Sequence, residues 1–145
     1  YALDAKTGCA YWKFETEGEV RGAIQAYKRD DGKLMLIAGD RKAAVYGIDA
    51  DSGKQLWKDK PEAHPWAMNT GSAAFHGKRM YVPFASFEEL AGGSPTYECC
   101  TFRGSVVAYE VETGKRLWQS YIIPEAPKKT VVTAKGVQLW GPSGA

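Results

Sequence analysis

One short pattern recurs along this chain, and its fullest copy reads Tyr46-Gly47-Ile48-Asp49-Ala50-Asp51-Ser52-Gly53-Lys54-Gln55-Leu56-Trp57. Its first part alternates apolar and polar residues, which is typical of a strand with one buried face. The Asp-x-x-Ser-Gly that follows favours a tight turn, because Gly readily takes a positive φ and the Asp side chain can cap the turn. Lys-x-Leu-Trp then begins a second strand. The pattern therefore predicts a β-hairpin whose Trp packs against a neighbouring unit.

The pattern occurs twice more, in residues 1–12 and in residues 107–118, so that the copies end at Trp12, Trp57 and Trp118. The three tryptophans are 45 and 61 residues apart. A period in the mid-forties with strand-and-turn chemistry is typical of a propeller blade. We therefore expect residues 1–145 to be all-β and to form part of a single β-propeller domain, a fragment of about three partial blades. Since three partial blades cannot close a ring, we expect the parent protein to be several times longer.

Between the hairpins, alternation predicts further short strands, at residues 21–27, 33–38, 43–48, 69–75 and 79–84. Turns are expected at residues 29–32 and 76–78, each of which contains a Gly. Residues 85–98 read as an insertion rich in Gly, Ser and Pro, and they account for most of the longer second spacing. Insertions between blade strands project at one face of the disc, where function is usually found.

The composition is that of an ordinary globular protein, with 44% hydrophobic residues, 25% charged residues and a net charge of +2. So small a charge, with no dense Lys/Arg cluster, argues against a nucleic-acid partner. No apolar run approaches the roughly 18 residues that a membrane helix needs, so no membrane span is expected. The two histidines, His64 and His76, have no Cys or carboxylate at a metal-ligand spacing, so a zinc site is not expected.

Two adjacent cysteines, Cys99 and Cys100, stand at the far end of the insertion, and Arg103 follows three residues later. A disulfide between neighbours removes almost no loop entropy, so its use would be as a hard apolar surface for a flat group. Arg103 would add a planar, charged fork suited to a carboxylate or a quinone oxygen. From the residues alone, the alternative of two reduced cysteines packed as small hydrophobes is equally good. The third cysteine, Cys9, reads as a packed or free thiol near a turn.

Other polar residues carry weaker signals. The chain has no Gly-x-Ser-x-Gly elbow and no phosphate-binding Gly-rich loop before a helix. Glu88 and Glu89, inside the insertion, could face a substrate channel, but a solvated pair in a loop is the more ordinary expectation. For His64-Pro65-Trp66 the sequence favours a position away from the central face.

The repeat Ala/Gly-x-Asp-x-x-Thr/Ser-Gly-Lys-x-x-Trp resembles that of the pyrroloquinoline quinone (PQQ) β-propeller superfamily. The first copy departs from the pattern at Cys9 and Ala10, and the third has Glu110 in place of the Asp. Two further segments are more specific, namely Cys99-Cys100-Thr101-Phe102-Arg103-Gly104 and Gly141-Pro142-Ser143-Gly144-Ala145. With them, the chain is similar to the quinoprotein alcohol dehydrogenases, and most closely to their polyvinyl-alcohol dehydrogenase branch.

This resemblance implies an eight-bladed propeller in which Cys99 and Cys100 form a vicinal disulfide against one face of PQQ. It implies that Arg103 contacts the cofactor, although in the related methanol dehydrogenases the arginine lies a little further from the cysteines. It also implies that Ser143, Gly144 and Ala145 present hydroxyl and backbone N–H groups to a cofactor carboxylate. The Ca²⁺ ligands and the catalytic Asp of the family lie beyond Ala145, so no catalytic residue and no metal ligand is expected within this chain.

The activity that the resemblance implies is oxidation of an alcohol to a carbonyl, with PQQ and Ca²⁺ as cofactors and a cytochrome c as electron acceptor. The substrate would be a small, secondary or polymeric alcohol, and the compartment the bacterial periplasm, where a vicinal disulfide can persist. The alternative is not an enzyme, because similar blades occur in scaffolds of outer-membrane protein assembly that hold no cofactor and bind other proteins. The cysteine pair, Arg103 and Ser143 separate the two, since a scaffold needs none of them.

Overall fold

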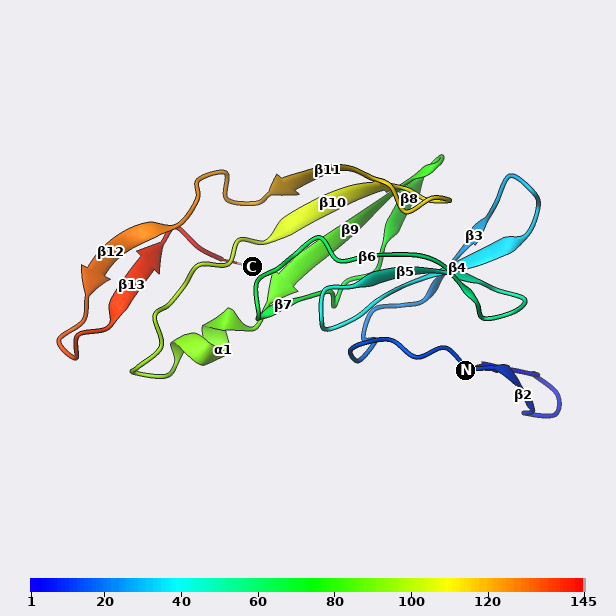
Figure 1. Ribbon diagram of the computed structural model, residues 1–145, viewed down its shortest axis with the longest axis horizontal. Helices are drawn as coiled ribbons and strands as arrows, with labels where there is room; N and C mark the ends of the chain where they lie inside the picture. Colours follow the sequence, from blue (N-terminus) through cyan, green and yellow to red (C-terminus); the bar gives the residue numbers. More distant parts are fainter. Residues whose placement is uncertain (145) are drawn as a thin grey trace.

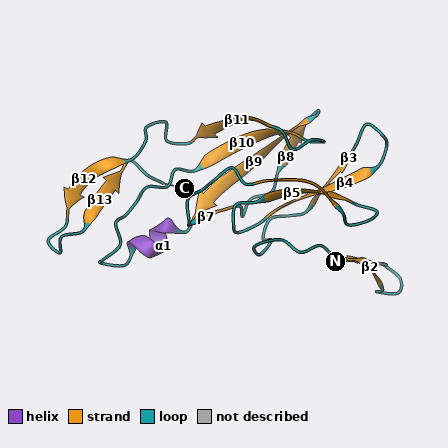
Figure 2. Ribbon diagram, in the orientation of Figure 1, coloured by secondary structure: helices purple, strands orange, loops and turns teal. Residues whose placement is uncertain are grey.

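The computed structural model describes residues 1–144, which are almost entirely antiparallel strands and connecting turns (Figures 1 and 2). This confirms the all-β expectation. One four-stranded sheet follows the chain order, each strand pairing with the next: β3 (Gln25–Lys28), β4 (Leu34–Gly39), β5 (Val45–Asp49) and β6 (Gln55–Asp59). Such a four-stranded antiparallel meander is one blade of a propeller.

A second sheet lies beside the first in Figure 1 and is built in the same way. Its members are β7 (Ala67–Met68), β8 (Ala74–His76), β9 (Arg79–Ser86), β10 (Ser105–Glu110) and β11 (Arg116–Tyr121). β7 and β8 both pair with β9, at its two ends, and so together form the first strand of this blade. Two hairpins flank the sheets, one at each end of the molecule: β1 (Ala2–Leu3) with β2 (Ala10–Trp12), and β12 (Lys128–Val132) with β13 (Gln138–Gly141). The three expected hairpins thus belong to two complete blades and one half blade, and β12–β13 begins another.

The strand expected at residues 69–75 is wrong over residues 69–73, where the chain leaves the sheet between β7 and β8, and only its end at residues 74 and 75 lies in a strand. The reason lies in the facing strand, because Pro83 sits in the middle of β9 and has no N–H to donate to a ladder. Its carbonyl accepts instead from the buried side-chain amide of Asn69, at 2.7 Å. The side chain of Asn69 therefore replaces a backbone pairing.

The repeat hairpins form as their sequence predicts. In the second copy, Asp49 Oδ1 accepts hydrogen bonds from the backbone N–H and the hydroxyl of Ser52, at 2.8 and 2.6 Å. Gly53 closes the turn with a φ of 70°, which is the left-handed region that favours Gly. The Glu110 that replaces Asp in the third copy keeps part of this cap, because its carboxylate accepts from the hydroxyl of Thr113.

The second and third hairpins each also contact the Trp of the preceding copy. Trp12 Nε1 donates to the carbonyl of Ala50 at 3.1 Å, and Trp57 Nε1 donates to the carbonyl of Val111 at 3.0 Å. The Trp57 ring lies so close to Gly114 that a Cβ there would stand 2.4 Å from a ring atom. This confirms for Trp12 and Trp57 that the repeated tryptophan packs against a neighbouring unit. Trp118, the last of the three, lies on the outermost strand and remains 44% exposed.

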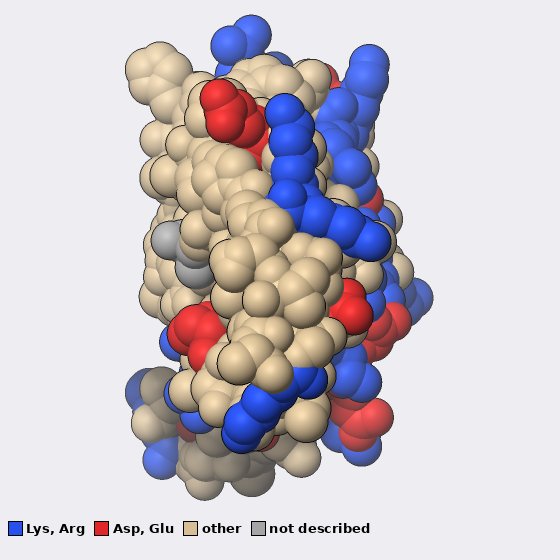
Figure 3. Space-filling view, turned by 90° about the vertical axis from the view of Figure 1, so that its left-hand side faces the viewer, with Lys and Arg blue, Asp and Glu red and all other residues tan. Residues whose placement is uncertain are grey.

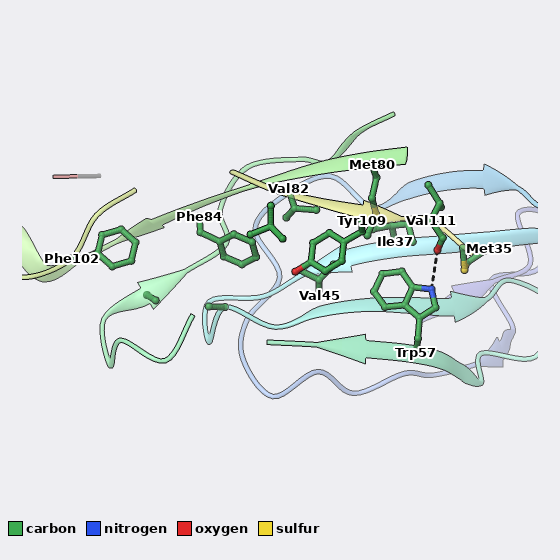
Figure 4. Packing of buried hydrophobic residues seen from close by; sticks show 13 residues of the cluster. Met35, Ile37, Val45, Trp57, Met80, Val82, Phe84, Phe102, Tyr109 and Val111 are labelled. Atoms are coloured by element: carbon green, nitrogen blue, oxygen red, sulfur yellow. Dashed lines mark hydrogen bonds between the residues drawn. The ribbon is translucent and has the colours of Figure 1, made fainter. Parts of the chain in front are cut away.

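The main core lies between the two complete sheets (Figure 4). Side chains of the first sheet face those of the second across this seam, among them Met35, Ile37, Val45, Trp57, Met80, Val82, Phe84, Tyr109 and Val111. Burial of these apolar side chains is the main force that holds the two blades together. Figure 3 looks at the end of the molecule that carries β12 and β13, where charged side chains of both signs surround a largely uncharged surface.

The insertion is not merely a loop. β9 continues through Ser86, and a short helix, α1 (Glu88–Gly92), follows Phe87. Glu88 and Glu89 occupy the first turn of α1, where negative charge is favourable beside free backbone N–H groups. Within residues 1–144, no helix has the length and apolar character that a membrane crossing would require.

Candidate functional site

The two segments singled out in the sequence are residues 99–104 and 141–145, and they lie side by side as far as the structure describes them, through residue 144. Trp140 N–H donates to the carbonyl of Cys99 at 2.7 Å, and Gly144 N–H donates to the carbonyl of Phe102 at 3.0 Å. Gly104 N–H returns a bond to the carbonyl of Gly144 at 2.6 Å. Backbone pairing therefore brings the cysteine pair and Ser143–Gly144 to one place, although they are far apart in the sequence.

Cys99 and Cys100 are joined by a disulfide, which decides between the two alternatives that the residues alone left open. The end of α1 rests on this disulfide at Gly92, where a Cβ would lie 2.5 Å from Cys99 Sγ and 3.4 Å from Cys100 Sγ. Only a residue without a side chain allows this approach. Cys9 is a free, exposed thiol in the β1–β2 hairpin, so of its two expected states the free one is confirmed.

A cavity of about 260 Å³ opens beside the disulfide. Its walls come from the end of β9, from α1, from the cysteine segment and from the segment after β13, through Ser86, Glu88, Glu89, Cys100, Phe102, Ser143 and Gly144. Cys100 and Phe102 give it an apolar wall, and Ser143 adds a hydroxyl. Two of the predicted site segments thus line one cavity, and a flat group could lie there against the disulfide.

Glu88 is buried in the wall of this cavity, with only 2% of its surface exposed, so the expectation of a solvated loop pair is wrong for this residue. Its Oε2 accepts from the N–H of Phe102 at 2.7 Å, and both of its oxygens accept from the N–H of Thr101 at 2.9 Å. The hydroxyl of Tyr97 adds a bond of 3.2 Å. Glu89 beside it is exposed, as expected.

The ionisation of Glu88 reflects two opposed effects. Burial by itself would raise the pKa of the carboxyl, because a charge is poorly solvated away from water. The N–H groups of Phe102 and Thr101 stabilise the charged form, and His64 and the hydroxyl of Tyr97 add to this. Together they outweigh the penalty, so the pKa of Glu88 lies below its ordinary value. Glu88 is therefore a carboxylate at neutral pH.

His64 supports the same segment from behind. Its Nε2 lies 3.1 Å from Thr101 Oγ1 and 3.5 Å from Glu88 Oε1, and its ring meets the edge of Phe102. The N–H of Trp66 donates to Nδ1 at 3.3 Å, so in the neutral ring the proton sits on Nε2, facing the hydroxyl and the carboxylate. The sequence did not indicate a place for His64 beside the cysteine segment. For Glu88, a signal was present in the acidic residues directly after a strand, which mark the first turn of a helix.

Arg103 turns toward the connector between β11 and β12. Its Nη1 donates to the carbonyls of Ile123 and Pro124, at 3.1 and 2.8 Å, and its guanidinium carbon lies 3.9 Å from the centre of the Tyr121 ring. Such stacking on an aromatic face suits the planar guanidinium. Arg103 is not among the described residues that line the cavity. The structure therefore does not bring its guanidinium together with the disulfide at this cavity.

The last segment is placed in part. Ser143 and Gly144 line the cavity, but the N–H of Gly144 is already used in the bond to Phe102. Ala145 lies outside the described residues. Among residues 1–144, the walls of the cavity contain two glutamates and neither Lys nor Arg, so a negatively charged ligand would need cations from elsewhere. In the same range, no cluster of three or more His, Cys, Asp or Glu side chains could hold a metal ion.

Known proteins resemble this chain over nearly its whole length. Residues 1–139 match the PQQ_2 family, described as outer membrane protein assembly factor BamB. The polyvinylalcohol dehydrogenase of Sphingopyxis sp. (strain 113P3) is 40% identical over 99% of this chain and 22% of its own length. That of Pseudomonas sp. is 35% identical over 99% of this chain and 23% of its own length. This chain thus spans about a fifth of the length of the curated relatives that it matches.

Among solved structures, the crystal structure of quinohemoprotein alcohol dehydrogenase from Comamonas testosteroni is similar, with a TM-score of 0.60. The alignment covers 82% of this chain and 17% of that chain, at 20% sequence identity. A likeness at this identity concerns the fold alone, and it identifies the two sheets as blades of a propeller of this type.

Proposed function

From the premise that this chain belongs to the PQQ_2 family, we propose that it is part of a PQQ-dependent alcohol dehydrogenase with an eight-bladed propeller. One observation carries the proposal: backbone pairing gathers the vicinal disulfide and Ser143–Gly144 around a single cavity. A propeller that served only as a scaffold would need neither. The similarity to two polyvinylalcohol dehydrogenases, over 99% of the chain, supports the same conclusion.

The cavity suits one side of PQQ, which is a flat, fused ring system with carboxylate groups. The disulfide and the ring of Phe102 would contact its face, and the hydroxyl of Ser143 would donate to an oxygen at its rim. When bound, PQQ supplies the electrophilic quinone carbonyl that accepts the electrons of the alcohol. The wall residues of this chain would fix the plane of the ring and keep water from that face.

The predicted cofactor contacts of Gly144, Arg103 and Ala145 differ in what they require of the structure. Gly144 would approach the cofactor with its backbone while its N–H remains bonded to Phe102. A contact from Arg103 stays a prediction, because it requires the guanidinium to leave the carbonyls of Ile123 and Pro124. A contact from Ala145 likewise stays a prediction.

The rest of the proposed reaction lies outside this chain. The Ca²⁺ ligands and the catalytic Asp would come from the parts of the protein that complete the ring, as would the cations that neutralise the cofactor carboxylates. We propose a secondary or polymeric alcohol as substrate, because the most similar of the named relatives are called polyvinylalcohol dehydrogenases. A cytochrome c as electron acceptor and the bacterial periplasm as compartment belong to the same proposal.

A second candidate function is a scaffold that binds other proteins. The description of the matching family, an outer membrane protein assembly factor, favours it. Under this alternative the cavity would hold no quinone, and the disulfide would serve only to pack against α1.

The test uses the full-length protein that contains this chain, produced in the periplasm and incubated with PQQ and Ca²⁺. Dye reduction is followed with primary, secondary and polymeric alcohols, for the unaltered protein and for a Cys99→Ser/Cys100→Ser variant. Cys9→Ser serves as the matched control, since this thiol is exposed and lies in another hairpin. Turnover that requires PQQ and falls only in the double variant supports the dehydrogenase. If no PQQ is retained and no turnover occurs, the scaffold is the better description.

A further inference from the structure

Helix α1 contacts the cysteine segment at both of its ends. At its start, the carboxylate of Glu88 accepts the N–H groups of Thr101 and Phe102, the two residues that directly follow the disulfide. At its end, the backbone of Gly92 rests on Cys99 Sγ. A helix of five residues thus meets the disulfide itself and the chain that leaves it.

We infer that Glu88 is a positioning residue, which holds the disulfide in place as a wall of the cavity. An ionised carboxylate offers about four lone-pair sites and no donor, so it can satisfy both N–H groups and the hydroxyl of Tyr97 at once. Hydrogen bonds to a charged acceptor are also stronger than neutral ones. Without Glu88, the N–H of the buried Phe102 would lose its partner, and backbone N–H groups are rarely left in that state.

The same contacts assign Glu88 a supporting role, rather than a direct one in proton transfer. Both of its oxygens are already engaged by donors of the cysteine segment, although the side chain lines the cavity. That the disulfide wall contacts PQQ rests on the proposed function. That Glu88 and Gly92 hold the disulfide in place does not rest on it, so the positioning role and the cofactor contact can be tested separately.

The first measurement is the ease of reduction of the disulfide in the full-length protein, in a Cys9→Ser background that removes the free thiol. Dithiothreitol gives two electrons and two protons to the S–S bond and closes to its own cyclic disulfide, which leaves two thiols at Cys99 and Cys100. Trapping with a maleimide and mass spectrometry of the peptide measures the reduced fraction. The second measurement is the dissociation constant of PQQ, with Ca²⁺ present.

The variants are Glu88→Gln, which keeps the shape but has one acceptor oxygen and two donors, and Gly92→Ala. Glu125→Gln is the control for the first, because Glu125 is exposed on the connector before β12. Gly93→Ala is the control for the second, because Gly93 has an ordinary helical φ of −68° and its Cβ would approach only the carbonyl of Leu90, at 3.3 Å.

We expect Glu88→Gln and Gly92→Ala each to lower the dithiothreitol concentration for half reduction about tenfold, as the loss of one charge-assisted hydrogen bond or an equivalent clash would. Both should weaken PQQ binding by a similar factor, while the controls stay within about twofold of the parent. An unchanged reduction midpoint in Glu88→Gln overturns the inference. If that variant does not fold by circular dichroism, Gly92→Ala decides by the same criterion. A shifted midpoint in a protein that binds no PQQ supports the inference and refutes the proposed function.

Discussion

The contact between Trp57 and Gly114 predicts that replacing Gly114 by Ala weakens the seam between the two blades. Two costs add at this position. Gly114 has a φ of 68°, and a residue with a Cβ pays about 1 kcal/mol in that region. The new Cβ would also stand 2.4 Å from an atom of the Trp57 ring, a degree of overpacking that typically costs about 1–3 kcal/mol. We therefore expect the free energy of unfolding to fall by about 2–4 kcal/mol.

Gly32 provides a matched control, because it shares the first cost and lacks the second. Its φ is 81°, and no atom lies within 4 Å of the position that a Cβ would take. Gly32→Ala should therefore lower the free energy of unfolding by only about 1 kcal/mol. Urea unfolding of the full-length protein, followed by circular dichroism, gives both values when the slopes with denaturant agree.

A double-mutant cycle isolates the clash. In a Trp57→Ala background the ring is gone, so Gly114→Ala should cost only the backbone term, and the coupling energy should be about 1–3 kcal/mol. Equal losses for Gly114→Ala and Gly32→Ala, or a coupling near zero, would show that the ring yields without cost. The Gly of the repeat would then be required only by the positive φ of the turn.

Three further predictions concern ionisable side chains. Burial raises the pKa of Tyr46 to about 12, so the contribution of its neutral hydroxyl to the free energy of unfolding is fully present below the ordinary value of 10 and is lost as the pH rises from 10 toward 12. Tyr46→Phe should not show this loss in urea unfolding at alkaline pH. The pKa of Glu88 is lowered, so the stabilisation of the cysteine segment by its carboxylate is fully present above the ordinary pKa of a glutamate and is lost as acid protonates the carboxylate. Reduction of the disulfide by a phosphine should therefore become easier at low pH in the unaltered protein, but not in Glu88→Gln. Arg103→Ala should cost about 1–3 kcal/mol of stability through Tyr121 and two carbonyl bonds. If the same variant also bound PQQ tenfold more weakly, this would support the predicted contact between Arg103 and the cofactor.

The hairpins could be predicted from the sequence because their causes are local. The turn of the second copy depends on Asp49 and Gly53, which lie four residues apart, and the structure uses both as the pattern indicates. The packing of Trp57 could also be predicted, since a repeated aromatic residue in a repeated unit has a repeated neighbour. The cysteine segment and the residues after Trp140 were recognised by resemblance, and the structure places both beside one cavity.

The parts that could not be predicted depend on partners distant in the sequence. The break between β7 and β8 depends on the hydrogen bond from the Asn69 side chain to the carbonyl of Pro83, and no sequence pattern around residue 69 predicts that contact. The burial of Glu88 depends on two N–H groups more than ten residues away. Arg103 seemed suited to a ligand by its chemistry, but the same chemistry suits backbone carbonyls and the Tyr121 ring equally well. A residue type states what a side chain can bind, and only the fold decides which partner it meets.

The cavity lies where one blade gives way to the next, and this position has a mechanical consequence. One wall belongs to the second complete blade, through α1 and the disulfide, while Ser143 and Gly144 belong to the chain that follows β13. Three backbone hydrogen bonds join these walls, from Trp140, Gly144 and Gly104. Because the cavity is shaped by the same bonds that join the two parts of the chain, a change that loosens this junction should also change the affinity for a ligand. The strength of blade-to-blade packing and the geometry of the proposed cofactor site are therefore not independent properties of this protein.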